Sequence, residues 1–241
     1  MKALLAQARA EVAMTLRRGE SLLLALGIPV ILLVFFSVVD ILPTPAGTKR
    51  AVDFLAPGIL ALAVMSTGMV SLGIATAFER QYLVLKRLGS TPLGRPALLA
   101  AKTGAVVVVE LVQVIALTAV ALALGWRAHP SAATAVAAVI VATVAFSGLG
   151  LLMAGTLKAE LTLAAANGLY LVLLLLGGMV VPLSRLPGGL RALARLLPAA
   201  ALSDVLRQGL GGPSAYRGAW LVLVAWAVVA PVAAALTFRW E

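Results

Sequence analysis

Residues 54–78 of this chain read FLAPGILALAVMSTGMVSLGIATAF and contain no charged side chain. A helix of about 20 apolar residues is long enough to cross the hydrocarbon core of a lipid bilayer. Five further stretches are of similar length and nearly as apolar, namely residues 21–42, 103–125, 131–157, 161–183 and 218–238. The sequence therefore predicts an all-α integral membrane protein with six transmembrane helices, which form a single transmembrane domain over residues 1–241.

The composition of the whole chain supports a lipid environment. Hydrophobic residues make up 62% of its 241 residues and charged residues only 12%, whereas about 25% of the residues of soluble domains are charged. This composition excludes a soluble enzyme and a disordered chain. The net charge of +10 does not indicate nucleic-acid binding, because the basic residues lie between apolar stretches and aromatic residues are only 5%. Basic residues in such positions favour the cytoplasmic face and its anionic lipids.

The distribution of basic residues predicts the orientation. With six spans both chain ends lie on the same side, and outside residues 184–217 the lysines and arginines concentrate in the tails and loops of that side. The positive-inside rule then puts both termini in the cytoplasm. Within residues 1–20, apolar and basic positions alternate at helical spacing, which predicts an amphipathic helix at the membrane interface. Such a helix is suited either to anchoring the first span or to contacting a partner protein.

The loop between the second and third spans, residues 79–96, has the sequence ERQYLVLKRLGSTPLGRP. Residues 79–88 are long enough for a short helix, Gly89 is a typical helix stop, and Pro92 prevents continuation. Two functions fit this loop: a positively charged segment that only sets the topology, and a docking helix for a cytoplasmic partner. A phosphate-binding loop is excluded, since it needs Gly-Lys-Ser/Thr after a strand.

The segment after the fifth span, residues 184–213, is an exception to the charge rule, because it is rich in arginine on the outer side of a six-span topology. Pro187 suits the start of one short helix, and Pro198 separates it from a second. Arg191 and Arg195 lie four residues apart on one side of the first helix. The alternative is an inner amphipathic segment with a different number of spans.

Few polar side chains lie inside the predicted spans. Glu110 and Gln113 are in the third span, and Asn167 and Tyr170 are in the fifth. A carboxyl within a membrane is costly and usually faces protein or water, so these residues are candidates for a substrate pathway. The alternative is that they only form hydrogen bonds between helices. With one histidine and no cysteine in the chain, we predict no metal site and no catalytic residues.

Three motifs resemble the permease subunits of type-2 ABC exporters, in particular the drug- and antibiotic-resistance-like branch. The first is Leu-Ala-Pro-Gly-Ile at residues 55–59. The second is an acidic-basic pair followed by Lys-Arg-Leu-x-x-Thr-Pro-Leu, carried here by Glu79, Arg80, Lys86, Arg87, Leu88, Gly89, Thr91 and Pro92. The third follows the fifth span and includes Pro182, Pro187, Pro198 and Arg207. Many members have a second acid and a glycine after the acidic-basic pair, where this chain has Gln81 and Tyr82.

The resemblance covers nearly the whole chain and implies a transporter that depends on partners. Two ABC ATPase subunits, which bind ATP and Mg, would dock on residues 79–93 and on the N-terminal helix. A second permease subunit, identical or different, would complete the exporter in a bacterial inner membrane. Residues 184–213 would form a re-entrant helical hairpin on the outer side. The chain itself would hold no cofactor and would not be an enzyme.

The transported compound is predicted from the character of the spans. Their apolar interior and the short loops favour a small hydrophobic or amphipathic compound, such as a drug, an antibiotic or a lipid. Polysaccharide or glycolipid exporters share the architecture, but more aromatic residues would be expected along their channel than the three Tyr and four Trp of this chain. A proton-coupled secondary transporter would need acids in matching halves of an inverted repeat, and Glu110 has no counterpart in the later spans.

Overall fold

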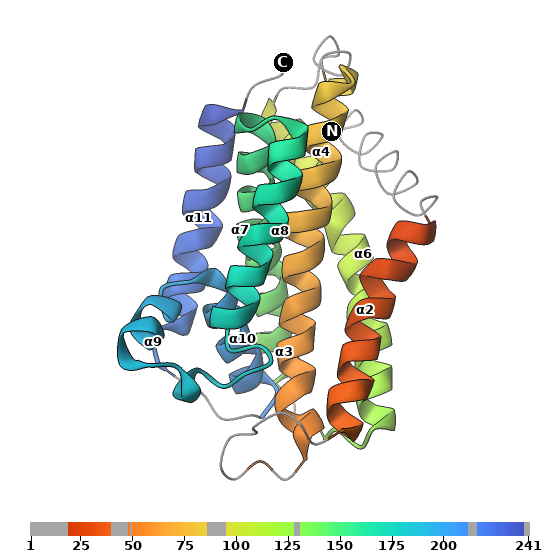
Figure 1. The fold of residues 1–241 in the computed structure, drawn as a ribbon, viewed down its shortest axis with the longest axis vertical. Coiled ribbons are helices and arrows are strands. Elements are labelled where there is room, and N and C mark those ends of the chain that lie inside the picture. Colours follow the sequence, from red (N-terminus) through yellow and green to blue (C-terminus); the bar gives the residue numbers. More distant parts are fainter. Residues whose placement is uncertain are drawn as a thin grey trace.

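The computed structural model describes residues 19–39, 48, 50–85, 95–127, 131–211 and 216–238. These residues are helical almost throughout and include no strand, so the all-α prediction is confirmed for them (Figure 1). Most of the amphipathic helix expected over residues 1–20 lies outside the described residues. So does the part of the loop between the second and third spans from residue 86 to residue 94.

Eleven helical segments follow one another along the described chain. They are α2 (Gly19–Val38), α3 (Ala51–Met65), the π-helix η1 (Ser66–Ser71), α4 (Leu72–Gln81), α6 (Arg95–Ala123), α7 (Ala132–Thr156), α8 (Ala159–Leu176), the 3₁₀ turn η2 (Leu183–Arg185), α9 (Gly188–Ala194), α10 (Pro198–Gly209) and α11 (Ala219–Thr237). Five helices are long and apolar enough to cross a membrane, counting α3, η1 and α4 as one continuous helix. The first predicted span is represented by α2, whose apolar part is the shorter stretch Ala25–Val38.

Two spans have ends that differ from the predicted ones. Helix α6 begins at Arg95, well before the predicted residue 103, because Pro96 fits the first turn of a helix, where its missing N–H is not needed. Helix α8 ends at Leu176, before the predicted residue 183. Its end is set by Gly178, which has a φ of +65°, a conformation that glycine adopts without steric cost.

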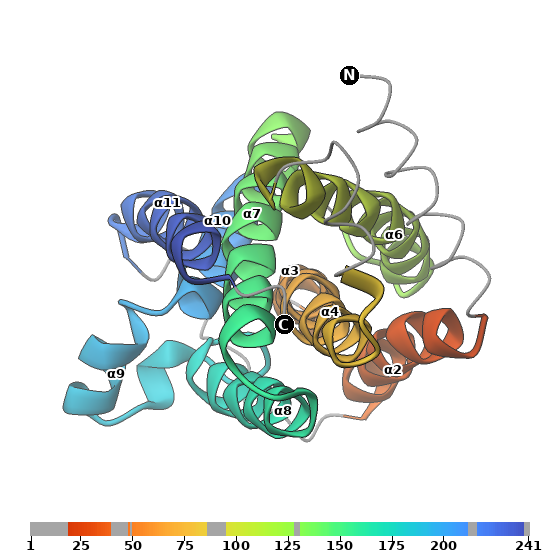
Figure 2. The ribbon, with the colours of Figure 1, turned by 90° about the horizontal axis from the view of Figure 1, so that it is seen from above.

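The continuous helix α3–η1–α4 forms the centre of the bundle. Seen from above, it is surrounded by α2, α6, α7 and α8 (Figure 2). In its most apolar stretch 72% of the residues are buried, whereas only 22% are buried in the corresponding stretches of α8 and α11. The outward faces of α6, α8 and α11 carry exposed leucine, isoleucine and valine side chains. This distribution suits a bundle whose outer surface meets lipid or another subunit instead of water.

The central helix crosses α7 at very close range. A Cβ atom added to Gly150 of α7 would lie 2.6 Å from the carbonyl oxygen of Met69 in η1. Only a residue without a side chain permits this approach, and small residues are the usual means of helix packing in lipid. Gly150 therefore sets the distance between these two helices.

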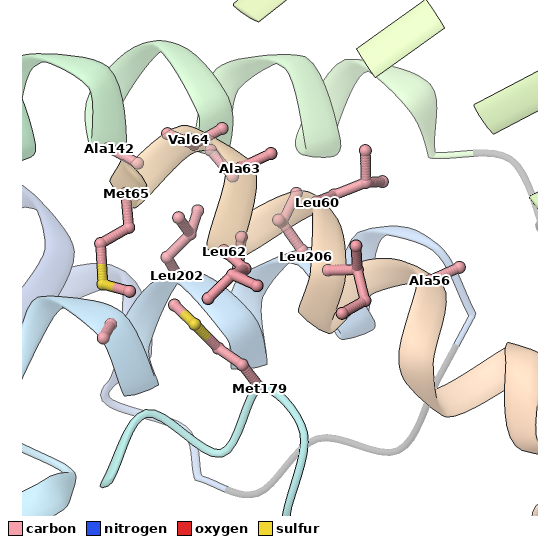
Figure 3. Close-up of a cluster of buried hydrophobic side chains, with 14 of the residues drawn as sticks. Ala56, Leu60, Leu62, Ala63, Val64, Met65, Ala142, Met179, Leu202 and Leu206 are labelled. Carbon is pink, nitrogen blue, oxygen red and sulfur yellow. The ribbon is translucent and has the colours of Figure 1, made fainter. Parts of the chain in front are cut away.

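Helix α10 belongs to the core and not to the surface of the bundle. Every residue of α10 except Gln208 is buried. Figure 3 shows Leu202 and Leu206 of α10 beside Leu62 and Met65 of α3, together with Met179 from the turn after α8. The segment between the fifth and sixth spans thus contributes directly to the main hydrophobic cluster.

Candidate functional site

The acidic member of the loop motif, Glu79, lies in the last turn of α4 and pairs with a lysine of α6. Lys102 Nζ donates to Glu79 Oε2 over 2.5 Å. The lysine side chain is only 1% exposed and the glutamate side chain 16%. An ammonium group buried to this degree requires an acidic partner, since an unpaired buried charge is strongly unfavourable. The pair therefore joins the end of the second span to the first part of the third.

The next two residues join the same turn to the connection between α7 and α8. The guanidinium of Arg80 donates to the carbonyl oxygen of Leu157. Gln81 Nε2 donates to Glu160 Oε1 over 2.9 Å. Gln81 is the position at which this sequence departs from the usual motif, and it contributes to this contact. Glu160 lies in the first turn of α8, so this bond joins the end of α4 to the start of α8.

The expected docking helix has a different beginning. Residues 79–81 complete α4, and the chain then turns at Tyr82 and at Leu83, whose φ is +59°. A separate helix therefore does not begin at Glu79. The other predicted docking residues lie outside the described residues, namely Lys86, Arg87, Leu88, Gly89, Thr91 and Pro92.

Glu110 and Gln113 are both buried in the middle of the bundle. The hydroxyl of Thr143 in α7 lies within hydrogen-bond distance of Glu110 Oε2. Thr67 Oγ1, in the π-helix, donates to Gln113 Oε1 over 2.9 Å, and Gln113 Nε2 donates to the carbonyl oxygen of Ala25 in α2 over 2.8 Å. These two residues of α6 thus connect α6 to α7, to η1 and to α2.

The other two pathway candidates do not join this group through any described contact. Asn167 is exposed on α8, and its side-chain amide donates to the carbonyl oxygen of Leu163 in the same helix over 2.8 Å. Tyr170 is half-buried on the same helix. The structure therefore brings Glu110 and Gln113 together and leaves Asn167 and Tyr170 at a separate location.

The two short helices expected after the fifth span are present as α9 and α10, which Pro198 separates as expected. Pro182 directly precedes the turn η2, and Pro187 directly precedes α9. Arg191 supports this region by donating to the carbonyl oxygens of Leu183, Ser184 and Leu186 at 3.1, 2.7 and 2.9 Å. Arg195 lies over the ring of Tyr216, 5.7 Å from its centre. Leu190 and Leu193 of α9 are exposed, so their side of this short helix faces outward.

Arg207 of α10 is buried, with 4% of its surface exposed. Its Nη2 donates to the carbonyl oxygens of Gly178 and Met179 over 2.5 and 3.3 Å, and its guanidinium lies 4.1 Å from the centre of the Phe54 ring. Burial lowers the pKa of Arg207 to about 10, and nearby Asp204 partly opposes this, so the side chain stays charged at neutral pH. Arg207 therefore links α10, the turn after α8 and the start of α3.

The family model of the ABC-2 type transporters matches residues 2–210, most of the chain. The chain belongs to the ABC-2 type transporter family. No curated protein matches it. Membership makes the chain a multi-pass membrane permease component of an ABC transporter, and it implies association with ABC ATPase subunits.

Residues of the motifs described above take part in contacts between helices. Glu79 and Arg80 connect α4 to α6 and to the α7–α8 connection, and Arg207 connects three segments at the other end of the bundle. Sequence reasoning missed three partners of candidate residues, namely Lys102 for Glu79, Phe54 for Arg207 and Thr143 for Glu110. For Lys102 a signal was available, since a lysine in an otherwise apolar stretch usually requires an acidic partner. No comparable signal marks Thr143 or Phe54.

Proposed function

We propose that this chain is the six-span permease subunit of an ATP-driven ABC exporter. Two permease subunits, identical or different, and two ATPase subunits form the transporter. The ATPases bind ATP and Mg and dock on residues 79–93 and on the N-terminal amphipathic helix. The permease has no nucleotide site or catalytic residues of its own and works by rearranging its helices.

The observation that carries this proposal is the bonding of the last turn of α4. Glu79 is paired with Lys102 of α6, Arg80 is bonded to the Leu157 carbonyl, and Gln81 is bonded to Glu160. The chain leaves this turn directly into the loop that carries the docking motif. A displacement of the loop by an ATPase would therefore act at once on the central helix, on α6 and on the connection between α7 and α8.

The positions of the loop and the hairpin support the proposed orientation. The end of α4 and the helices α9 and α10 lie at opposite ends of the bundle (Figure 1). With the docking loop in the cytoplasm, residues 184–213 lie on the outer side as a re-entrant hairpin, and both termini are cytoplasmic in the bacterial inner membrane. The burial of α10 favours a re-entrant hairpin, because irregular backbone at membrane depth must be packed against protein.

The count of six spans rests on α2 as a transmembrane helix. Its 20 residues correspond to a rise of about 30 Å at 1.5 Å per residue, which matches the thickness of the hydrocarbon core. Its exposed side chains include Ile28, Ile31 and Phe35. The bond from Gln113 to the carbonyl oxygen of Ala25 attaches α2 to α6 within the bundle.

For the substrate we propose a small hydrophobic or amphipathic compound, such as a drug, an antibiotic or a lipid. The buried side chains of the described bundle are mostly apolar, with a few polar groups around Glu110 and Gln113. An apolar interior with few polar groups is typical of sites that bind small apolar ligands. We expect such compounds to stimulate the ATP turnover of the assembled transporter, and polysaccharide or glycolipid not to do so.

The docking proposal is tested by reversing two charges of the loop. The double variant Lys86→Glu and Arg87→Glu is co-expressed with a candidate ABC ATPase subunit, and co-purification and ATP turnover are measured. The matched control is Arg185→Glu with Arg217→Glu, which makes the same change of charge at exposed positions of the opposite end. We expect the loop variant to lose the ATPase and the control to retain it. Equal binding by both variants would show that this loop is not the docking site.

A further inference from the structure

The carboxyl of Glu110 lies in an environment without an opposing charge. Its residue is 1% exposed, and it faces α7 and the π-helix η1. The segments α7, η1 and α11 contain no charged residue. The charged residues of α2 and α3 are both acids, Glu20 near the start of α2 and Asp53 in the first turn of α3, so neither helix supplies a positive charge. The nearest basic residue of α6 is Lys102, two turns away and paired with Glu79.

The hydrogen bonds of Thr143 indicate which form of the carboxyl is present. Thr143 Oγ1 lies 2.8 Å from the carbonyl oxygen of Val139 and also within hydrogen-bond distance of Glu110 Oε2. A hydroxyl has one proton, so it forms one strong hydrogen bond as a donor and only weaker ones if that proton is shared between two acceptors. Both contacts are strong hydrogen bonds when the Glu110 carboxyl is protonated and donates to the threonine oxygen, while the threonine donates to Val139.

The second oxygen of the carboxyl leads to the same conclusion. Oε1 of Glu110 has no hydrogen-bond partner among the described residues. This oxygen lies near Gly68 of η1 and the backbone of Ser147. A Cβ atom added to Gly68 would be 3.6 Å from Oε1 and 3.5 Å from the Ser147 nitrogen. The nearby Ser147 hydroxyl is also without a partner in the described structure. An ionised carboxylate requires several donors or a cation when buried, and this environment supplies neither.

From this geometry we infer that Glu110 is a proton-binding site inside the bundle, which holds a proton while α6 and α7 are packed together. The proton sits on Oε2 and forms the bond to Thr143 across the two helices. When the helices part and water reaches the carboxyl, the O–H bond breaks, the proton passes to water and the carboxylate remains. Closure of the helices takes the proton up again. The opening and closing steps rest on the proposed transport function, whereas the bound proton does not.

The bound proton is tested by infrared difference spectroscopy of the permease in lipid nanodiscs at neutral pH. The spectrum of the native protein minus that of Glu110→Gln should contain the carbonyl stretch of a protonated carboxylic acid. The matched control is Glu160→Gln, the same change at an exposed site, and its difference spectrum should lack this band. Absence of the band from the Glu110→Gln difference would overturn the inference.

A second variant keeps the carboxyl in place, so that the test does not depend on the folding of Glu110→Gln. Thr143→Val removes the hydroxyl that accepts the hydrogen bond from the carboxyl, and the acid band should shift in frequency, while Thr143→Ser should return it to its native position. An acid band that does not respond to Thr143→Val would show that the proton is not held between α6 and α7.

The role of the proton in transport is tested with the assembled complex. The ATP turnover of the native complex should depend on pH, and this dependence should be reduced in the Glu110→Gln complex relative to the native complex. Identical pH profiles would overturn the proton release on opening. If no ATPase assembles with the permease, the proposed transport function fails, and the infrared result still decides whether Glu110 holds a proton.

Discussion

Replacement of Arg207 by methionine should destabilise the bundle by about 3 kcal/mol, an order-of-magnitude sum of four effects. The bond to the Gly178 carbonyl, 2.5 Å long, is charge-assisted and contributes about 2 kcal/mol. The longer bond to Met179 and the contact with the Phe54 ring add about 1 kcal/mol each. Removing a buried charge regains about 1 kcal/mol of desolvation free energy, which offsets part of the loss.

The assay is reversible unfolding in mixed micelles with increasing dodecyl sulfate, followed by the fluorescence of the four tryptophans. Arg207→Lys keeps the charge but loses the planar guanidinium that contacts both the carbonyls and the Phe54 ring. Its stability should therefore lie between those of the native protein and Arg207→Met. Arg195→Met is the matched control, because Arg195 is exposed and its position above Tyr216 should be worth less than about 1 kcal/mol.

A double-mutant cycle separates the ring contact from the carbonyl bonds. Phe54→Leu and Arg207→Met are measured singly and together, and the coupling free energy between them should be about 1 kcal/mol. A loss for Arg207→Met no larger than that for Arg195→Met would refute the reasoning. It would mean that the hydrogen bonds from the guanidinium to the carbonyls of residues 178 and 179 do not stabilise the fold.

Two further predictions concern other close contacts. Glu79→Gln removes the carboxylate that pairs with buried Lys102 and should lower the free energy of unfolding by about 2 kcal/mol. The control Glu160→Gln, at an exposed site, should lower it by less than about 0.5 kcal/mol. Equal losses in the unfolding assay would contradict this. Gly58→Ala places a Cβ atom 1.9 Å from the carbonyl oxygen of residue 179, so a loss of about 3 kcal/mol is expected. Gly104→Ala, with no atom within 4 Å of the added Cβ, should be neutral or stabilising by up to about 1 kcal/mol, and a similar result for both glycines would argue against the close approach.

Much of the fold follows from local properties of the sequence. Runs of about 20 apolar residues predict transmembrane helices, and five helices of the described structure are long and apolar enough to cross a membrane. Pro187 and Pro198 predict the two short helices after the fifth span, because proline starts a helix readily and cannot continue one. Both features depend only on neighbouring residues, so they can be predicted without knowledge of the tertiary structure.

The ends of helices were less predictable than their existence. The sequence suggests a separate helix from Glu79, while the structure continues α4 to Gln81. The π-helix Ser66–Ser71 carries no distinctive residue pattern in the sequence. Both features result from contacts with other helices, such as the bonds of residues 79–81 and the close crossing of α7, and these contacts outweigh local preferences.

By itself the sequence determined that the protein is a helical membrane bundle of the ABC-2 type, with few polar groups inside its spans. Only the tertiary structure decided which groups meet: Glu79 with Lys102, Glu110 with Thr143, and Arg207 with Phe54. The physical reason is that a transmembrane helix such as α7 is apolar on all sides. Its sequence therefore carries little information about which face turns inward. The rotation and depth of each helix, and with them the partners of its rare polar residues, are set by close packing against its neighbours.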